Sequence, residues 1–207
     1  MKLYYSPNSI SIVVAIALEE MGLPYEKVLV DFASSEQTSA TYLKTNPKGR
    51  VPALATQQGI LTETGAILEY LQSLSTSTGL IPSDAFQAAR MREAMYYLAS
   101  TMHINHAHKR RGNRWVTNQS SIDDMQAKVA ENMNASCAYM RDNFPLTPYV
   151  LGAHFSLADP YFYIISTWLE GDGVDITRYP ELIEFKAAME SRASVQSVID
   201  AGLLDAQ

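Results

Sequence analysis

The sequence predicts a small α/β domain followed by an all-helical domain. Apolar runs in about the first 75 residues alternate between strand-like and helix-like patterns. A connector rich in Ser, Thr, Gly and Pro, STSTGLIPSD, comes next, and no convincing strand follows it. We therefore expect a first domain at residues 1–76, a linker at 77–84 and a helical domain at 85–207.

The first domain is predicted to run β-α-β-α-β-β-α. Its segments are, in order, KLYYS, SIVVAIALEEMG, LPYEKVLVDF, SATYLKTNP, VPALAT, GILTE and TGAILEYLQSLS. Gly22 suits the end of the first helix, and Pro47 ends the second. The short link QQG between the third and fourth strands predicts a hairpin.

The second domain is predicted to be helical throughout. Its expected helices are DAFQAARMREAMYYLASTMHINHAH, DDMQAKVAENMNASCAYMRDNF, SLADPYFYIISTWLEG and PELIEFKAAMESRASVQSVIDAG. No internal repeat or low-complexity tract interrupts these patterns.

Composition excludes several classes of protein. The net charge of −6 and the pI near 5.2 argue against wholesale nucleic-acid binding. The one cysteine, Cys137, excludes an intramolecular disulfide and a Cys-rich zinc site. No apolar run approaches the length of a membrane span, and the chain opens without a charged-then-apolar leader. We expect a soluble cytoplasmic protein that binds no membrane.

Two motifs in the first domain have a physical meaning of their own. NPKGRVPAL reads as a turn that leads into a strand. In LTETGAI, Thr64 is a natural N-cap for the following helix. A helix start also offers free N–H groups and a positive dipole end to an anion, so Thr64 and its neighbour Glu63 could together hold a zwitterion.

A third motif, FSLADPYF, lies in the second domain. Ser156 and Asp159 form an S-x-x-D capping box there, whose expected role is folding and not chemistry. With the order of elements, the three motifs resemble the cytosolic glutathione transferases over almost the whole chain, and the pattern looks most like the bacterial beta class. The resemblance implies a thioredoxin-like N-terminal domain and an all-helical C-terminal domain that holds an electrophile pocket.

The resemblance also implies how glutathione binds. In the family the proline at Pro52 is cis, and the turn offers the backbone of Val51 to the cysteinyl backbone of glutathione. Glu63 and Thr64 would hold the ammonium and the carboxylate of the γ-glutamyl group. Arg50 belongs to the same expected glutathione-binding set.

Such an enzyme must ionise the thiol of glutathione. Lowering a thiol pKa by two units from near 8.5 takes about 2.7 kcal/mol. One hydrogen bond to a charged group supplies about 1.5–3 kcal/mol. A single hydroxyl assisted by a helix N-terminus would therefore suffice.

The loop YYSPNSISI offers three hydroxyls for this task. By resemblance, Tyr5 lies where the tyrosine-type classes carry their catalytic residue, and Ser9 lies where several serine-type classes carry theirs. Ile10 occupies the position of the beta-class cysteine, which removes thiol exchange at this position. We rank Ser9 first, Ser11 second and Tyr5 third. The structural alternatives are a half-buried strand residue for Tyr5 and the N-cap of the first helix for either serine.

The stretch MHINHAHKRRGNRW gathers three of the four histidines. Helical spacing puts His103 and His106 on one face. By resemblance, His103 matches a beta-class histidine that lines the active site. A zinc site is weakly supported because no acidic or cysteine ligand accompanies these histidines in the sequence. The basic residues could attract carboxylates or form a solvated turn; they are Lys109, Arg110, Arg111 and Arg114.

The function that the resemblance implies is a detoxifying glutathione transferase. Glutathione would be the co-substrate, and its thiolate would attack a small hydrophobic electrophile or a peroxide without a metal. Two alternatives remain: a glutathione-dependent isomerase or lyase, and a binding or regulatory protein that has lost the chemistry. The resemblance also implies a two-fold homodimer.

Overall fold

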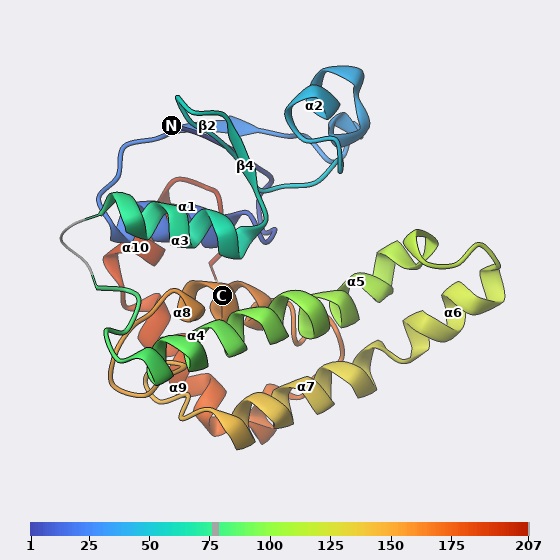
Figure 1. Cartoon of the computed structure of the whole chain (residues 1–207). Helices are drawn as coiled ribbons and strands as arrows, with labels where there is room; N and C mark the ends of the chain where they lie inside the picture. Colours follow the sequence, from blue (N-terminus) through green and yellow to red (C-terminus); the bar gives the residue numbers. More distant parts are fainter. Residues whose placement is uncertain (76–78, 207) are drawn as a thin grey trace. The chain divides into compact units, whose positions relative to one another are not determined.

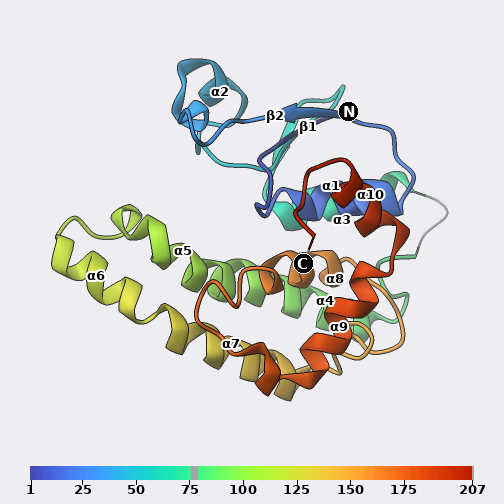
Figure 2. The same cartoon turned by 180° about the vertical axis from the view of Figure 1, so that it is seen from behind.

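The computed structural model describes residues 1–75 and 79–206, so part of the expected linker lies outside the described residues. The chain divides into two compact units, Met1–Ile81 with Glu190–Gln207, and Pro82–Met189. The first holds a sheet with helices and the second is helical (Figures 1 and 2), which confirms the predicted fold class. The segment from Glu190 onward groups with the first unit, whereas the sequence placed it in the helical domain.

A four-stranded sheet is the framework of the first unit. Its strands are β1 (Lys2–Tyr5), β2 (Glu26–Leu29), β3 (Ala53–Ala55) and β4 (Ile60–Thr62), in the spatial order β2-β1-β3-β4. β1 pairs in parallel with β2 and antiparallel with β3, and β3 and β4 form the predicted hairpin. A parallel pair needs a crossover connection, and the helix between β1 and β2 supplies it.

The helices of the first unit follow the predicted pattern closely. They are α1 (Ile12–Glu20), the 3₁₀ turn η1 (Glu36–Thr38), α2 (Ala40–Thr45), α3 (Thr64–Leu74) and α10 (Ala193–Asp200). Residues 12–18 of α1 are all buried, and α1 contacts β1, α3 and α10. Burial on every side explains why its sequence is apolar without a polar face. Gly22, at φ 62°, follows α1 in the left-handed conformation, as predicted.

The last predicted helix is two helices in the structure. α9 (Pro180–Glu190) ends before Arg192, whose backbone is extended, and α10 then packs against α1. Arg192 forms an ion pair with Glu20, and Ser194 Oγ donates to the same carboxylate at 2.7 Å. The contacting residues lie 172 and 174 positions apart in the chain, so the helical periodicity of the segment could not predict these contacts.

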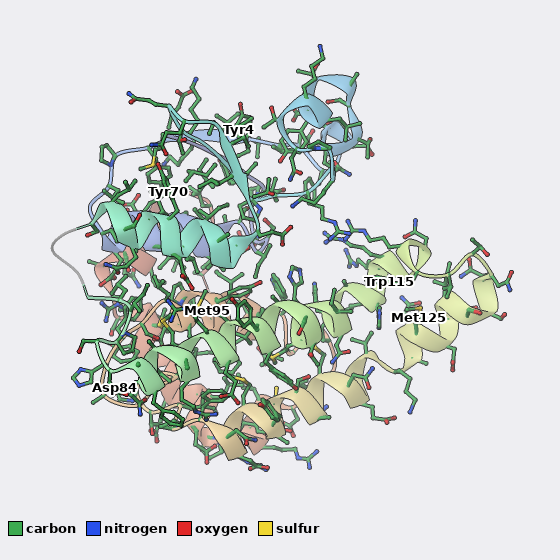
Figure 3. The ribbon with its side chains drawn as sticks, viewed as in Figure 1. Tyr4, Tyr70, Asp84, Met95, Trp115 and Met125 are labelled. Atoms are coloured by element: carbon green, nitrogen blue, oxygen red, sulfur yellow. The ribbon has the colours of Figure 1, made fainter. Side chains whose placement is uncertain are left out.

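The second unit consists of helices. They are α4 (Ala85–Tyr97), the π-helical turn η2 (Leu98–Met102), α5 (His103–Arg111), η3 (Gly112–Arg114), α6 (Gln119–Ala127), α7 (Val129–Asn143), α8 (Ala158–Ser166), η4 (Ile176–Arg178) and α9. The predicted helix that starts near residue 84 is confirmed, but it contains the unpredicted π turn just before His103. The predicted helix over 123–144 is interrupted at Lys128. Figure 3 shows Trp115 and Met125 toward the α5–α6 end of this unit.

The capping box before α8 is present in a modified form. Asp159 accepts from Ser156 N at 2.6 Å, as a capping box requires. Ser156 Oγ donates to the same carboxylate at 2.9 Å instead of accepting from Asp159 N. The second carboxylate oxygen accepts from Val150 N at 2.6 Å. Since Asp159 is fully buried, its carboxylate ties the preceding loop to the helix.

Among the described residues, no helix has both the length and the apolar character needed to cross a membrane.

Candidate functional site

The loop from Ser6 to Ser11 connects β1 to α1 and is held by its own serines. Ser11 is completely buried, and its Oγ accepts from Ser6 N at 3.1 Å and donates to Ser6 O at 3.2 Å. Ser9 is partly exposed, and its Oγ lies 2.7 Å from Ser6 O and 2.7 Å from Ser11 Oγ. Ser11 occupies the N-cap position of α1, as the structural alternative expected, but its side chain makes no cap bond.

The two serine hydroxyls differ in what they can offer a ligand. Each has one proton, and Ser11 can place its own on Ser6 O or on Ser9 Oγ. Ser9 Oγ accepts from Ser11 N at 3.3 Å and donates its proton to Ser6 O at 2.7 Å. Because Ser9 is partly exposed whereas Ser11 is buried, Ser9 is the serine whose hydroxyl can turn from Ser6 O toward an anion while Ser11 still holds it.

Tyr5 and Ile10 have different surroundings. Tyr5 is half-buried at the end of β1 and shares the face of that strand with the buried Leu3. Ile10 is only 7% exposed and belongs to the apolar core, so packing explains it. The neighbouring Tyr4 points to the opposite face of the sheet, where it packs edge-on against Tyr42 of α2.

Cys137 lies in α7, and burial raises the pKa of its thiol to about 12. Because the thiolate is the reactive form, we expect no reaction with an aromatic disulfide reagent at pH 8 in the folded protein, and full reaction after unfolding in guanidinium. The neutral thiol is favoured in the folded state, so this group contributes stability below pH 9 that is lost as the pH rises from 9 to about 12. Rapid labelling of the folded protein would contradict this expectation.

The turn before β3 has the geometry that the resemblance implied. The Val51–Pro52 peptide is cis, and the strand pairing of β3 begins after it at Ala53. Two buried side chains hold the turn, since Tyr42 Oη and Asn46 Nδ2 both donate to Arg50 O, at 2.7 and 2.6 Å. Val51 thus lies on a rigid turn, just outside the paired part of the sheet.

The start of α3 differs in one detail from the prediction. Glu63, not Thr64, occupies the N-cap position, and its φ of 72° is unusual for a residue with a side chain. Thr64 is the first residue of the helix and is buried. The side chain of Glu63 is 74% exposed and forms an ion pair with Lys48, whose ammonium also donates to Thr62 Oγ1 at 2.7 Å. Sequence reasoning missed Lys48, although it lies within the NPKG motif.

These groups could hold a zwitterion. The first N–H groups of α3 and the ammonium of Lys48 suit a carboxylate, and the exposed carboxylate of Glu63 suits an ammonium. Arg50 is exposed two residues beyond Lys48 and adds a second cation on the same turn. The predicted binding residues therefore lie on two rigid segments of one unit.

The histidine cluster of the second unit is organised around a buried carboxylate. One carboxylate oxygen of Asp172 lies 2.6 Å from His106 Nδ1, and its other oxygen accepts from Lys109 Nζ at 3.2 Å. The side chain of Asp172 is fully buried, whereas that of His106 is 28% exposed. The His106 ring stacks on Trp168 at 4.2 Å between centroids, and His103 lies 5.4 Å from the same ring.

This geometry changes the interpretation of the MHINHAH segment. The prediction singled out His103, but His106 is the histidine that a carboxylate orients. When Asp172 holds Nδ1–H, Nε2 is the nitrogen that can accept a proton. Lys109 is bound to Asp172 and to Gly171 O, so it is not part of a solvated basic turn. Over residues 1–75 and 79–206, no three His, Cys, Asp or Glu side chains gather in a way that could hold a metal ion.

Comparison with known proteins agrees with the geometry. A model of the glutathione S-transferase N-terminal domain matches residues 1–73. The structure of a glutathione transferase homologue from Sulfitobacter, with bound glutathione, is 53% identical with a TM-score of 0.96, and the match covers 98% of each chain. A beta-class glutathione S-transferase from Sphingomonas chungbukensis is 26% identical, with a TM-score of 0.83 and 98% of each chain covered. Glutathione S-transferase GstA of Escherichia coli O157:H7 is 26% identical over 97% of this chain and 98% of its own length.

The chain therefore belongs to the glutathione transferase family.

Proposed function

We propose that the protein is a glutathione transferase in which Ser9 helps to ionise the thiol of glutathione, and that the thiolate attacks a small hydrophobic electrophile or a peroxide. The observation that carries this proposal is the partly exposed Ser9 hydroxyl, which Ser11 anchors and whose proton can turn from Ser6 O to a ligand. The glutathione bound in the Sulfitobacter homologue, at 53% identity, supports glutathione as the co-substrate.

Glutathione would bind as an extended peptide along the first unit. The backbone of Val51 would pair with its cysteinyl residue, because the cis turn leaves Val51 outside the paired strand. The γ-glutamyl group would lie at the start of α3, with its ammonium on Glu63 and its carboxylate on Thr64 and the free N–H groups there. Arg50 would attract the remaining carboxylate.

The chemical step requires a stabilised thiolate. A hydrogen bond from Ser9 Oγ to the sulfur anion is worth about 1.5–3 kcal/mol, which lowers the thiol pKa by about one to two units. The glutathione sulfur attacks the electrophilic carbon and the leaving group departs with the electron pair of the broken bond. The thiol proton passes to solvent water, and Ser9 keeps its own proton throughout, since it stabilises the anion and forms no covalent bond.

A second candidate function is a glutathione-dependent isomerase or lyase. The pairing of His106 with the buried Asp172 favours it, because isomerisation and elimination move protons to or from carbon and an oriented imidazole performs such transfers. As a member of this family, the chain is also proposed to act as a cytoplasmic homodimer.

Glutathione binding and turnover provide the test. At glutathione concentrations near 100 times Kd, we expect stabilisation of about 2.7 kcal/mol, which raises Tm by about 5–10 °C. Conjugation of an aryl halide should follow, and Glu63→Gln should weaken the thermal shift. No shift at millimolar glutathione contradicts both functions. A shift without conjugation or peroxide reduction, but with isomerisation of an unsaturated carbonyl compound, favours the second candidate.

A further inference from the structure

The end of the chain holds the loop that carries Ser9. Asn8 N donates to Leu203 O at 3.0 Å. Asp205 N donates to Asn8 Oδ1 at 2.9 Å, and Asn8 Nδ2 donates to Asp205 Oδ2 at 2.7 Å. These three hydrogen bonds, termed the tail clasp, lie within the first unit and join the loop to residues 203–205.

The tail that forms the clasp is itself firmly placed. Leu203 and Leu204 are buried, at 1% and 3% exposed. They follow α10, which packs on α1, the same helix that the loop leads into. The loop is therefore tied at two points: Ser11 binds the backbone of Ser6, and the tail binds Asn8.

The clasp is poorly suited to a role in overall stability. Asn8 and Asp205 are both exposed, and polar contacts between exposed side chains contribute little to the free energy of unfolding. The conformation of Asn8 is instead specific, since its φ of 56° is left-handed and only Gly, Asn and Asp adopt it readily. The two hydrogen bonds that the Asn8 side chain makes with Asp205 hold this conformation, and they thereby fix the direction in which the backbone leads into Ser9.

We propose that Asn8 and Asp205 are positioning residues that aim the Ser9 hydroxyl at the sulfur of glutathione. The inference rests on the proposed function, because it assigns the clasp to the same thiol. Hydrogen bonds weaken steeply when the donor is misaligned, so a small rotation of the loop at Asn8 lowers the stabilisation that Ser9 gives to the thiolate. The glutathione contacts at Val51, Glu63 and Thr64 lie on other segments and remain in place.

Two variants weaken the clasp without forcing a new backbone conformation, and the backbone bond from Asn8 N to Leu203 O remains in both. Asn8→Gly keeps the left-handed φ and removes the side chain, and Asp205→Ala removes the carboxylate. We expect each to lower kcat at pH 7 by about 3- to 10-fold, with KM for glutathione within about twofold of the original. The ultraviolet absorbance of the bound thiolate, measured against pH, should show the pKa of the glutathione thiol moving toward its free value.

The controls separate positioning from a general loss of structure. Asp205→Asn keeps an acceptor oxygen and should recover most of the activity lost in Asp205→Ala. Asp200→Ala removes the same charge from the exposed end of α10 and should leave kcat unchanged. The double variant Asn8→Gly with Asp205→Ala should lose no more than Asn8→Gly alone, because Asn8→Gly already removes both side-chain bonds and Asp205→Ala removes only one of them.

The outcomes distinguish this inference from the function on which it rests. If the original protein binds glutathione but leaves its thiol pKa at the free value, the proposed function fails and the positioning role fails with it. If the original protein ionises the thiol and both clasp variants retain its kcat and thiol pKa, the tail clasp has no positioning role while the proposed function stands. A loss of activity in Asp200→Ala equal to that in Asp205→Ala likewise overturns the inference.

Discussion

Replacing Ser9 with alanine is expected to lower kcat for glutathione conjugation at pH 7 by about 10- to 100-fold. The change removes a hydrogen bond to a charged acceptor, which is worth about 1.5–3 kcal/mol, and each 1.4 kcal/mol is a tenfold change in rate. The rate of the variant should recover as the pH rises toward about 8.5, because free thiols ionise there without help. Stopped-flow or steady-state rates between pH 6 and 9 measure the effect.

Two further substitutions test the ranking of the three hydroxyls. Tyr5→Phe should leave kcat within about twofold, since the proposed donor is Ser9. Ser11→Ala should act indirectly: it removes the anchor of Ser9 and leaves Ser6 N without its acceptor in a buried place. We therefore expect a loss of both stability and activity in Ser11→Ala. Full activity in Ser9→Ala together with a large loss in Tyr5→Phe would show that Ser9 is not the thiol-activating group.

Replacing Asp159 with alanine is expected to destabilise the protein by about 3–5 kcal/mol. The carboxylate accepts from Val150 N, Ser156 N and Ser156 Oγ, and it is fully buried. The change leaves two backbone N–H groups without this acceptor, and an unsatisfied buried group costs about 1–3 kcal/mol. For a chain of this size, Tm should fall by about 10 °C or more in thermal unfolding.

The matched control for Asp159 is Asp142, an exposed aspartate in an ion pair with Arg141. Asp142→Ala should change the free energy of unfolding by no more than about 0.5 kcal/mol. Asp159→Asn should resemble the alanine variant, because one amide oxygen cannot replace two carboxylate oxygens that each accept from a different segment. Equal Tm values for the Asp159 and Asp142 variants would refute a structural role for the modified capping box.

Much of the first unit was predictable because its signals are local. The order of its strands and helices follows from apolar runs, from Gly22 and Pro47 at helix ends and from the short hairpin link. These features act within one turn or one strand of the residues that carry them. The motif around Pro52 also predicted the cis Val51–Pro52 peptide, by resemblance to a family in which that turn recurs.

The predictions from sequence were weaker where the interacting residues are far apart in the chain. The periodicity of the last segment predicted one helix, but the structure has a break near Arg192, where the chain forms an ion pair with Glu20 of α1. The sequence did not predict the pairing of His106 with Asp172, because the two residues lie 66 positions apart and nothing in the local pattern links them. The assignment of Thr64 as an N-cap missed the unusual backbone at Glu63.

The amino-acid pattern alone was thus enough to establish an α/β domain before a helical one, the likeness to glutathione transferases and the short list of hydroxyls in YYSPNSISI. It ranked Ser9 above Ser11 only by resemblance, since both are small hydroxyl residues near a helix start. Folding makes them different: Ser11 is buried against Ser6, Ser9 is partly exposed, and the tail clasp at Asn8 comes from the other end of the chain. Hydrogen bonds depend on distance and direction in space, and sequence separation does not report either.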